Sequence, residues 1–162
     1  MENGKYYWGL LRIALGFIMF WAFIDKVFGL GFATTPAKSW LSGGSPTLGF
    51  LKFGTKGPFA AWFQAIAGNP LVDWLFMIGL LLIGLALLLG IGVRIAGYSG
   101  ALMMLLMYAA SFIPPVNNPV LDDHLIYAII FIAFTVVKPG TAFGLGNWWT
   151  ETALVKRFPI LE

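Results

Sequence analysis

Long apolar stretches constrain this chain more than any other feature of its sequence. The stretch from Leu75 to Leu89 holds no charged side chain, and three further stretches are nearly as apolar. A helix of about 20 apolar residues crosses the hydrocarbon core of a bilayer. Charged residues make up only 10% of the chain, whereas typical soluble domains carry about 25%. The sequence therefore predicts an integral membrane protein.

The hydrophobic pattern predicts an all-α fold, a four-helix transmembrane bundle that forms one domain over residues 1–162. The predicted spans cover about residues 8–30, 70–91, 95–113 and 121–138. The segment after the first span is rich in Gly, Ser, Pro and Lys, a composition typical of turns. Within it, residues 58–67 are apolar but too few to cross, so we expect a short interfacial helix in this first loop.

Charged residues indicate how the predicted bundle lies in the membrane. Four spans place both ends of the chain and the turn at Gly92 on one side. That side holds Lys5, Arg12, Arg94, Lys138, Lys156 and Arg157, whereas four aspartates offset the cations of the other side. Because cytoplasmic segments carry an excess of Lys and Arg, we expect a multi-pass protein of the cytoplasmic (cell) membrane with an N-in/C-in orientation.

Several classes of cofactor and partner do not fit this composition. The chain has no cysteine, which excludes disulfides, iron–sulfur clusters and thiolate zinc sites within it. A single histidine cannot ligate a haem from both sides, and no glycine pattern in a strand–helix context indicates a flavin. We therefore expect no haem, flavin or metal in this chain. The net charge of +3 is too small and dispersed to indicate nucleic-acid binding.

The start of the last predicted span gathers most of the chemistry-bearing side chains. Asp122 is a good helix N-cap, and Asp123 and Tyr127 are four residues apart, so they share a helix face. His124 is the side chain most easily tuned to exchange protons near neutral pH. These residues predict a site in which Asp123, His124 and Tyr127 are catalytic. A hydrated capping turn at the membrane surface explains the same residues, and the sequence leaves both interpretations open.

Ionisable residues in the first span supply candidates for substrate binding. Arg12 and Lys26 fall on one helical stripe with Gly16, whereas Asp25 points elsewhere. Cations on this stripe either face the bundle interior or snorkel to the nearest headgroup layer. We take Arg12, Lys26, Asp25, Asp122 and Arg94 as candidate substrate-binding residues.

Four motifs together resemble the DoxX/DoxD family of small four-helix membrane proteins. They are Arg12-Ile-Ala-Leu-Gly16 leading to Asp25-Lys26, Gly90-Ile-Gly-Val-Arg94, Asn118-Pro-Val-Leu-Asp-Asp-His-Leu-Ile-Tyr-Ala128 and Gly144-Leu-Gly-Asn-Trp148. The chain is most similar to the DoxD subunit of thiosulfate:quinone oxidoreductase. This resemblance implies oxidation of thiosulfate to tetrathionate, transfer of electrons to a quinone and a DoxA-like second subunit. The family supplies no residue-level catalytic assignment.

The sequence is compatible with two main classes of function. The first is a redox enzyme subunit that oxidises thiosulfate, or a related reduced sulfur compound, and reduces a quinone. The second is a non-catalytic subunit that anchors or assembles a larger respiratory complex. A small-solute carrier is a third reading, because paired charges in a bundle can line a path. In each case the partners include the lipid bilayer, and homo-oligomer formation is left open.

Overall fold

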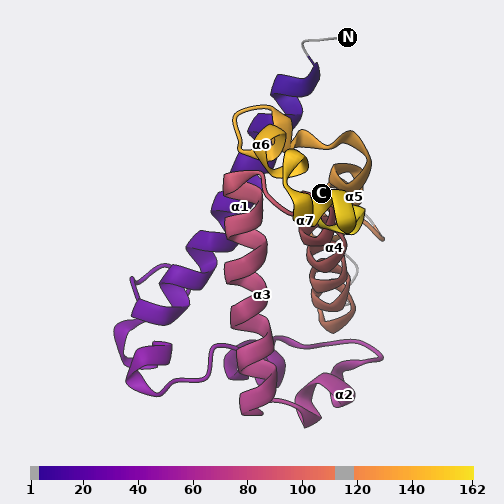
Figure 1. The fold of residues 1–162 in the computed structure, drawn as a ribbon. Helices are drawn as coiled ribbons and strands as arrows, with labels where there is room; N and C mark the ends of the chain where they lie inside the picture. The colour runs from indigo at the N-terminus through magenta and orange to yellow at the C-terminus, as the bar shows by residue number, and fades with distance from the viewer. Residues whose placement is uncertain (1–3, 112–118) are drawn as a thin grey trace.

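The computed structural model describes residues 4–111 and 119–162, and these are folded mainly into helices (Figure 1). Within these residues no β-strand forms, and the β-type pairing is limited to an isolated bridge between Lys56 and Ser111. The prediction of an all-α fold is confirmed.

Three helices are long and apolar enough to cross a membrane: α1 (Gly4–Phe28), α3 (Pro70–Leu89) and α4 (Val93–Ala110). A further apolar helix, α5 (Asp123–Val137), has 15 residues. At a rise of about 1.5 Å per residue, α5 is about 22 Å long, which is shorter than the hydrocarbon core of about 30 Å. The structure therefore supports a membrane protein with three candidate spans and a shorter apolar helix.

Short helical segments fill the first loop and follow α5. The first loop contains η1 (Pro36–Lys38), η2 (Trp40–Ser42), the π-helical turn η3 (Phe50–Gly54) and α2 (Ala60–Ala65). After α5 come η4 (Pro139–Thr141), α6 (Gly146–Glu151), α7 (Ala153–Arg157) and η5 (Pro159–Leu161). In Figure 1 the segments after α5 lie with the start of α1, whereas α2 lies at the opposite end. We call these the α6 end and the α2 end.

Helix boundaries differ from the predicted spans where local sequence favours another end point. α1 begins at Gly4, before the predicted residue 8, because no helix breaker separates Gly4 from the apolar stretch. It ends at Phe28, because Gly29 takes a left-handed conformation with φ of 67° and donates to Asp25 O at 2.7 Å. The predicted end of the third span at residue 113 lies outside the described residues, as does Asn118 of the third motif.

Glycines allow the helices to pack in two close pairs. Between α1 and α3, a Cβ on Gly16 would lie 2.8 Å from Leu87 Cβ, and a Cβ on Gly84 would lie 2.7 Å from the backbone nitrogen of Phe20. Between α4 and α5, a Cβ on Gly100 would lie 2.5 Å from the ring of Phe131. Small residues at such contacts are typical of membrane helices, where close backbone approach drives association.

The two helix pairs share one apolar core. Phe131 and Phe134 of α5 are buried in it and meet edge to face, with ring centroids 6.3 Å apart. Trp8 of α1 also packs edge to face on Phe134 at 6.3 Å. The other buried members come from all four long helices and include Leu15, Met19, Met77, Leu80, Ile83, Leu87, Ala101 and Met104. This core positions the ends of the helices, where the ionisable side chains lie.

The first loop folds over the α2 end of the bundle. Leu51 and Phe63 form a second buried cluster with Ala110 at the end of α4, and Lys56 N donates to Ala110 O at 3.0 Å. The short helix predicted at residues 58–67 is present but spans only Ala60–Ala65, because residues 57–59 form a turn before it. Its position at a membrane surface stays a prediction.

Candidate functional site

A cluster of three ionisable side chains opens α5 at the α2 end. Asp122 caps the helix as predicted, because its Oδ1 accepts a hydrogen bond from Leu125 N at 2.9 Å. Asp122 Oδ2 lies 2.8 Å from His124 Nδ1, and Asp123 Oδ1 lies 3.4 Å from the same nitrogen. Two carboxylates around Nδ1 favour a proton on it, so the other ring nitrogen is left to exchange protons.

Asp123 is far more exposed to solvent than Asp122 and His124. The side chain of His124 is 22% exposed and that of Asp123 is 70% exposed. Their ligand atoms and those of Asp122 lie within 4.8 Å of one another, which is close enough to hold a cation between them. The open position at the start of α5 suits proton exchange with an incoming molecule better than an enclosed metal centre.

An apolar groove lies beside this cluster on the outer face of α4 and α5. Leu105 of α4 and four residues of α5 line it, namely Leu125, Ala128, Ile129 and Ile132. The groove has a volume of about 290 Å³ and almost no polar lining. His124 and Ala128 are four residues apart and therefore neighbours on the helix surface. His124 thus lies one helical turn before this groove, toward the α2 end.

Tyr127 and Lys26 lie around the bundle core at this level. Tyr127 is partly buried and its ring packs against the main core. Lys26 is also partly buried, and its Nζ lies 6.0 Å from the ring centroid of Phe76. Among the described residues, Lys26 makes no ion pair within 4.0 Å, and the carboxylates of Asp122 and Asp123 pair with His124 instead.

Arg12 is fully buried, so it faces inward and does not snorkel to a membrane surface. Its guanidinium donates to Leu87 O and, at 3.2 Å, to Leu88 O at the end of α3. It also donates to Ala142 O and Phe143 O, each at 3.0 Å. A cation at a helix C-terminus is favoured by the helix dipole and by the unsatisfied carbonyls there. Arg12 therefore ties α1, α3 and the segment after α5 together.

Glycines make room for this buried guanidinium. A Cβ on Gly144 would lie 2.9 Å from Arg12 Nη2, and a Cβ on Gly90 would lie 3.1 Å from Nη1. Gly90 also takes a left-handed conformation with φ of 76° as it ends α3. The first, second and fourth motifs of the sequence thus meet in one knot, which we call the Arg12 knot: Arg12, Gly90, Gly144 and the four accepting carbonyls.

Two aspartates anchor the first loop. The buried carboxylate of Asp25 accepts from Phe32 N at 3.3 Å and from Ala33 N at 2.9 Å, just after α1. Asp73, at the start of α3, accepts from the hydroxyl of Ser45 at 2.9 Å and from the hydroxyl of Thr47 at 2.5 Å. Both acids are thus hydrogen-bonded to loop groups.

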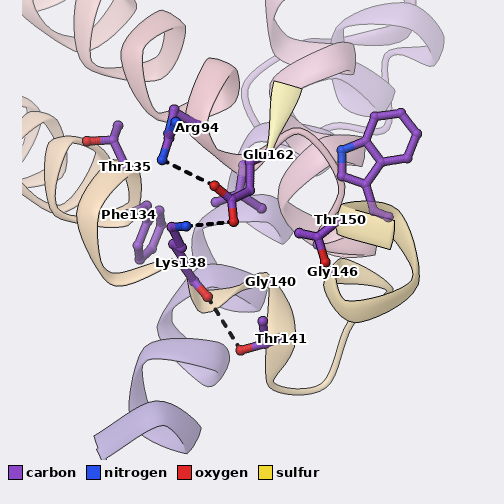
Figure 2. Close-up of a pocket in the computed structure, with 12 residues that line it drawn as sticks. Arg94, Phe134, Thr135, Lys138, Gly140, Thr141, Gly146, Thr150 and Glu162 are labelled. Atoms are coloured by element: carbon purple, nitrogen blue, oxygen red, sulfur yellow. Dashed lines mark hydrogen bonds and ion pairs between the residues drawn. The ribbon is translucent and has the colours of Figure 1, made fainter. Parts of the chain in front are cut away.

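Arg94 lies at the α6 end, where Figure 2 shows it beside a small pocket. Its Nη2 lies 3.2 Å from Glu162 Oε2, and Lys138 Nζ lies 2.6 Å from the other oxygen of the same carboxylate. Arg94 also donates to Pro159 O at 3.1 Å, and its backbone nitrogen donates to Glu162 O at 2.8 Å. The pocket itself has a volume of only about 30 Å³.

The structure divides the predicted site residues between the two ends of the bundle. Asp122, Asp123, His124 and Tyr127 lie along the opening turns of α5, and Asp25 and Lys26 lie near the end of α1, all toward the α2 end. Arg12 and Arg94 lie at the α6 end. Sequence reasoning missed two groups, Asp73 as a loop anchor and Glu162 as the partner of two cations. The sequence signal for the role of Asp73 was its isolated charge at the border of an apolar span.

Comparison with known protein families, with curated proteins and with solved structures finds no match to this chain.

Proposed function

We propose that this chain is a membrane oxidoreductase subunit that oxidises thiosulfate, or a related reduced sulfur compound, and passes the electrons to a quinone. Two thiosulfate anions lose one electron each as a sulfur–sulfur bond joins them into tetrathionate. The quinone takes up these two electrons and two protons and becomes a quinol. In this proposal α1, α3, α4 and α5 all cross the cytoplasmic membrane, α2 lies at its surface, and both ends of the chain are cytoplasmic.

The observation that carries the proposal is the position of His124 beside the open apolar groove of α4 and α5. A quinone has a polar ring and a long apolar tail, so it needs a proton donor next to an apolar surface. The groove along Leu125, Ala128 and Ile129 suits the tail, and His124 suits the ring. Asp122 holds the imidazole by its Nδ1 at 2.8 Å, which orients the other nitrogen for proton transfer. Asp123 is exposed enough to resupply protons from water.

The sulfur substrate is an anion and needs a cation near the same end. Of the predicted cations, Arg12 is committed to four carbonyls and Arg94 pairs with Glu162. Lys26 remains, because it is partly buried at the α2 end and, within the described residues, makes no ion pair with a carboxylate. We assign it to substrate binding and place the remaining sulfur contacts on a DoxA-like partner subunit.

A second candidate function is a non-catalytic membrane subunit that anchors or assembles a larger respiratory complex. It is favoured by Arg12, Asp25 and Asp73, whose charged groups each make hydrogen bonds to other parts of the fold. Under this function the Asp122–His124 pair serves only as the cap of α5.

The test is reduction of a quinone analogue by thiosulfate, catalysed by the purified protein. We expect His124→Ala to lower turnover by about 10²-fold or more, the typical contribution of a positioned proton donor. Asp123→Asn should lower it less, and Lys156→Gln, an exposed lysine at the other end, should leave it unchanged. Equal turnover in the wild type and His124→Ala would remove the proposed site. A wild type without turnover that co-purifies with large partners would favour the anchor function.

A further inference from the structure

The α6 end carries a cluster of three charged side chains, Arg94, Lys138 and Glu162, that the proposed redox function does not use. Arg94 from the start of α4 and Lys138 from the end of α5 converge on Glu162, one cation on each carboxylate oxygen (Figure 2). We propose that Arg94 and Lys138 form a binding site for the phosphate group of an anionic phospholipid, and that the Glu162 carboxylate occupies this site as an internal competitor.

The Glu162 carboxylate lies between two cations and compensates their charge. Among the residues that line the pocket, Glu162 is the sole acid, and Arg94 and Lys138 are the basic ones. If the carboxylate leaves, two positive charges face one another without compensation. A phosphate offers the same pair of oxygens to the two cations, and Arg in particular binds it through paired hydrogen bonds.

The backbone of Lys138 indicates that its side chain is used at this position. The residue takes a left-handed conformation with φ of 51° and ψ of 55° as it ends α5. Glycine usually ends a helix in this way, because a side chain there costs stability as its Cβ crowds the following carbonyl oxygen. Lysine bears this cost and gains a place for its amine at the helix C-terminus, where the dipole favours a cation. Its side chain remains 52% exposed, so an outside anion can reach it.

The surroundings of Lys138 favour a lipid as the source of the phosphate. The side chains just before it, Val136 and Val137, are 78% and 43% exposed, so the outer face of α5 stays apolar up to Lys138. Trp148 and Phe158 are exposed at the same end, and Arg157 lies over the Phe158 ring at 5.4 Å. Aromatic and basic side chains together are typical of the headgroup layer of a membrane. A lipid whose chains contact Val136 would therefore present its phosphate at the height of Lys138.

Lipid retention by the intact protein tests this site independently of any redox activity. We would extract the protein from mixed bilayers and measure by native mass spectrometry the ratio of bound phosphatidylglycerol to bound phosphatidylcholine. Glu162→Gln should raise this ratio, because it keeps the shape of the competitor and removes its charge. Lys138→Gln should lower it about fivefold, the equivalent of roughly 1 kcal/mol for a basic residue at an anionic surface. Lys138→Arg should keep it, and Lys156→Gln, an exposed lysine outside the pair, should change it less than Lys138→Gln.

The lipid ratio also separates the proposal from a simple loss of folding. A variant that only loosened the segment after α5 would lose both lipids alike and would leave their ratio unchanged, which would overturn the proposal. A ratio insensitive to Lys138→Gln would overturn it as well. Inorganic phosphate added without anionic lipid forms a second arm, read as a rise in the unfolding temperature of Glu162→Gln. If free phosphate stabilised this variant while its lipid ratio stayed at the wild-type value, the site would bind soluble anions and the lipid assignment would be wrong.

Discussion

The Arg12 knot and the Asp122–His124 cluster place ionisable side chains at opposite ends of the same bundle. The two sites differ in how deeply the charged group is buried and in the groups that bind it. Arg12 is fully buried and donates to four backbone carbonyls, without a carboxylate partner among the described residues. His124 keeps part of its side chain exposed and pairs with two acids next to it in the chain. The difference indicates that a charge inside a membrane helix can serve the fold alone, whereas an accessible titratable pair can serve chemistry.

The largest expected effect is the loss of stability caused by replacing Arg12. Arg12→Met would leave the carbonyls of Leu87, Leu88, Ala142 and Phe143 without their donor inside the bundle. We expect a loss of about 2–6 kcal/mol in the free energy of unfolding, since the hydrogen bonds to Leu87 O and Ala142 O are buried and each buried unsatisfied acceptor costs about 1–3 kcal/mol. Unfolding in detergent, followed by circular dichroism, measures it. Arg12→Lys should restore part of the loss, and a stable Arg12→Met protein would contradict the role of the knot.

A smaller effect tests the space that glycine provides in the knot. In Gly144→Ala the new Cβ would lie 2.6 Å from Gly140 O and 2.9 Å from Arg12 Nη2, so the backbone must shift. Overpacking of this kind costs about 1–3 kcal/mol. Gly49→Ala is the matched control, because a Cβ there meets nothing within 4 Å. Equal unfolding temperatures for the two variants would mean that the knot is looser than the structure shows.

Asp73 is a structural charge at the α2 end, where it holds the first loop by hydrogen bonds. Asp73→Ala removes the acceptor of the Ser45 and Thr47 hydroxyls and of Thr47 N. We expect a loss of about 1–3 kcal/mol, the cost of leaving a buried donor without its acceptor, together with faster proteolysis of the first loop. Asp73→Asn keeps an acceptor and should lose less. Proteolysis at the wild-type rate in Asp73→Ala would show that this loop is held by its apolar contacts alone.

The smallest effect on stability is expected at Asp122, where the effect on function should be large. Asn caps helices about as well as Asp, so Asp122→Asn should change the free energy of unfolding by less than about 0.5 kcal/mol. The same change removes the charge beside His124 Nδ1 and should slow thiosulfate-dependent quinone reduction. Loss of stability without loss of turnover would assign Asp122 to capping only.

The helices could be predicted from the sequence because their signals are local. The apolar content of residues 75–89 and the capping oxygen of Asp122 act within one helix, and the structure confirms both. The partners of the charged residues could not be predicted, because they are far apart in the chain. Leu87 and Ala142 accept from Arg12 across 75 and 130 residues. Backbone carbonyls also carry no sequence signal, so only the fold shows that Arg12 needs no acid.

The contact of Glu162 with Arg94 and Lys138 illustrates the same limit at a surface. These residues are 68 and 24 positions from Glu162, and nothing in the spacing of isolated charges indicates which of them pair. The orientation was predicted by counting Arg94 and Lys138 as positive charges on the cytoplasmic side, without a partner for either. In the structure they share one carboxylate, and the proposed lipid site follows from that geometry.

The most direct test of this division is the free energy of unfolding of Arg12→Met measured beside that of His124→Ala under the same conditions. The account predicts a loss of several kcal/mol for the arginine variant and less than about 1 kcal/mol for the histidine variant, which is exposed in part and makes its contacts within one turn. Equal losses, or a larger loss at His124, would contradict the claim that the buried charge builds the fold and the accessible one is kept for chemistry.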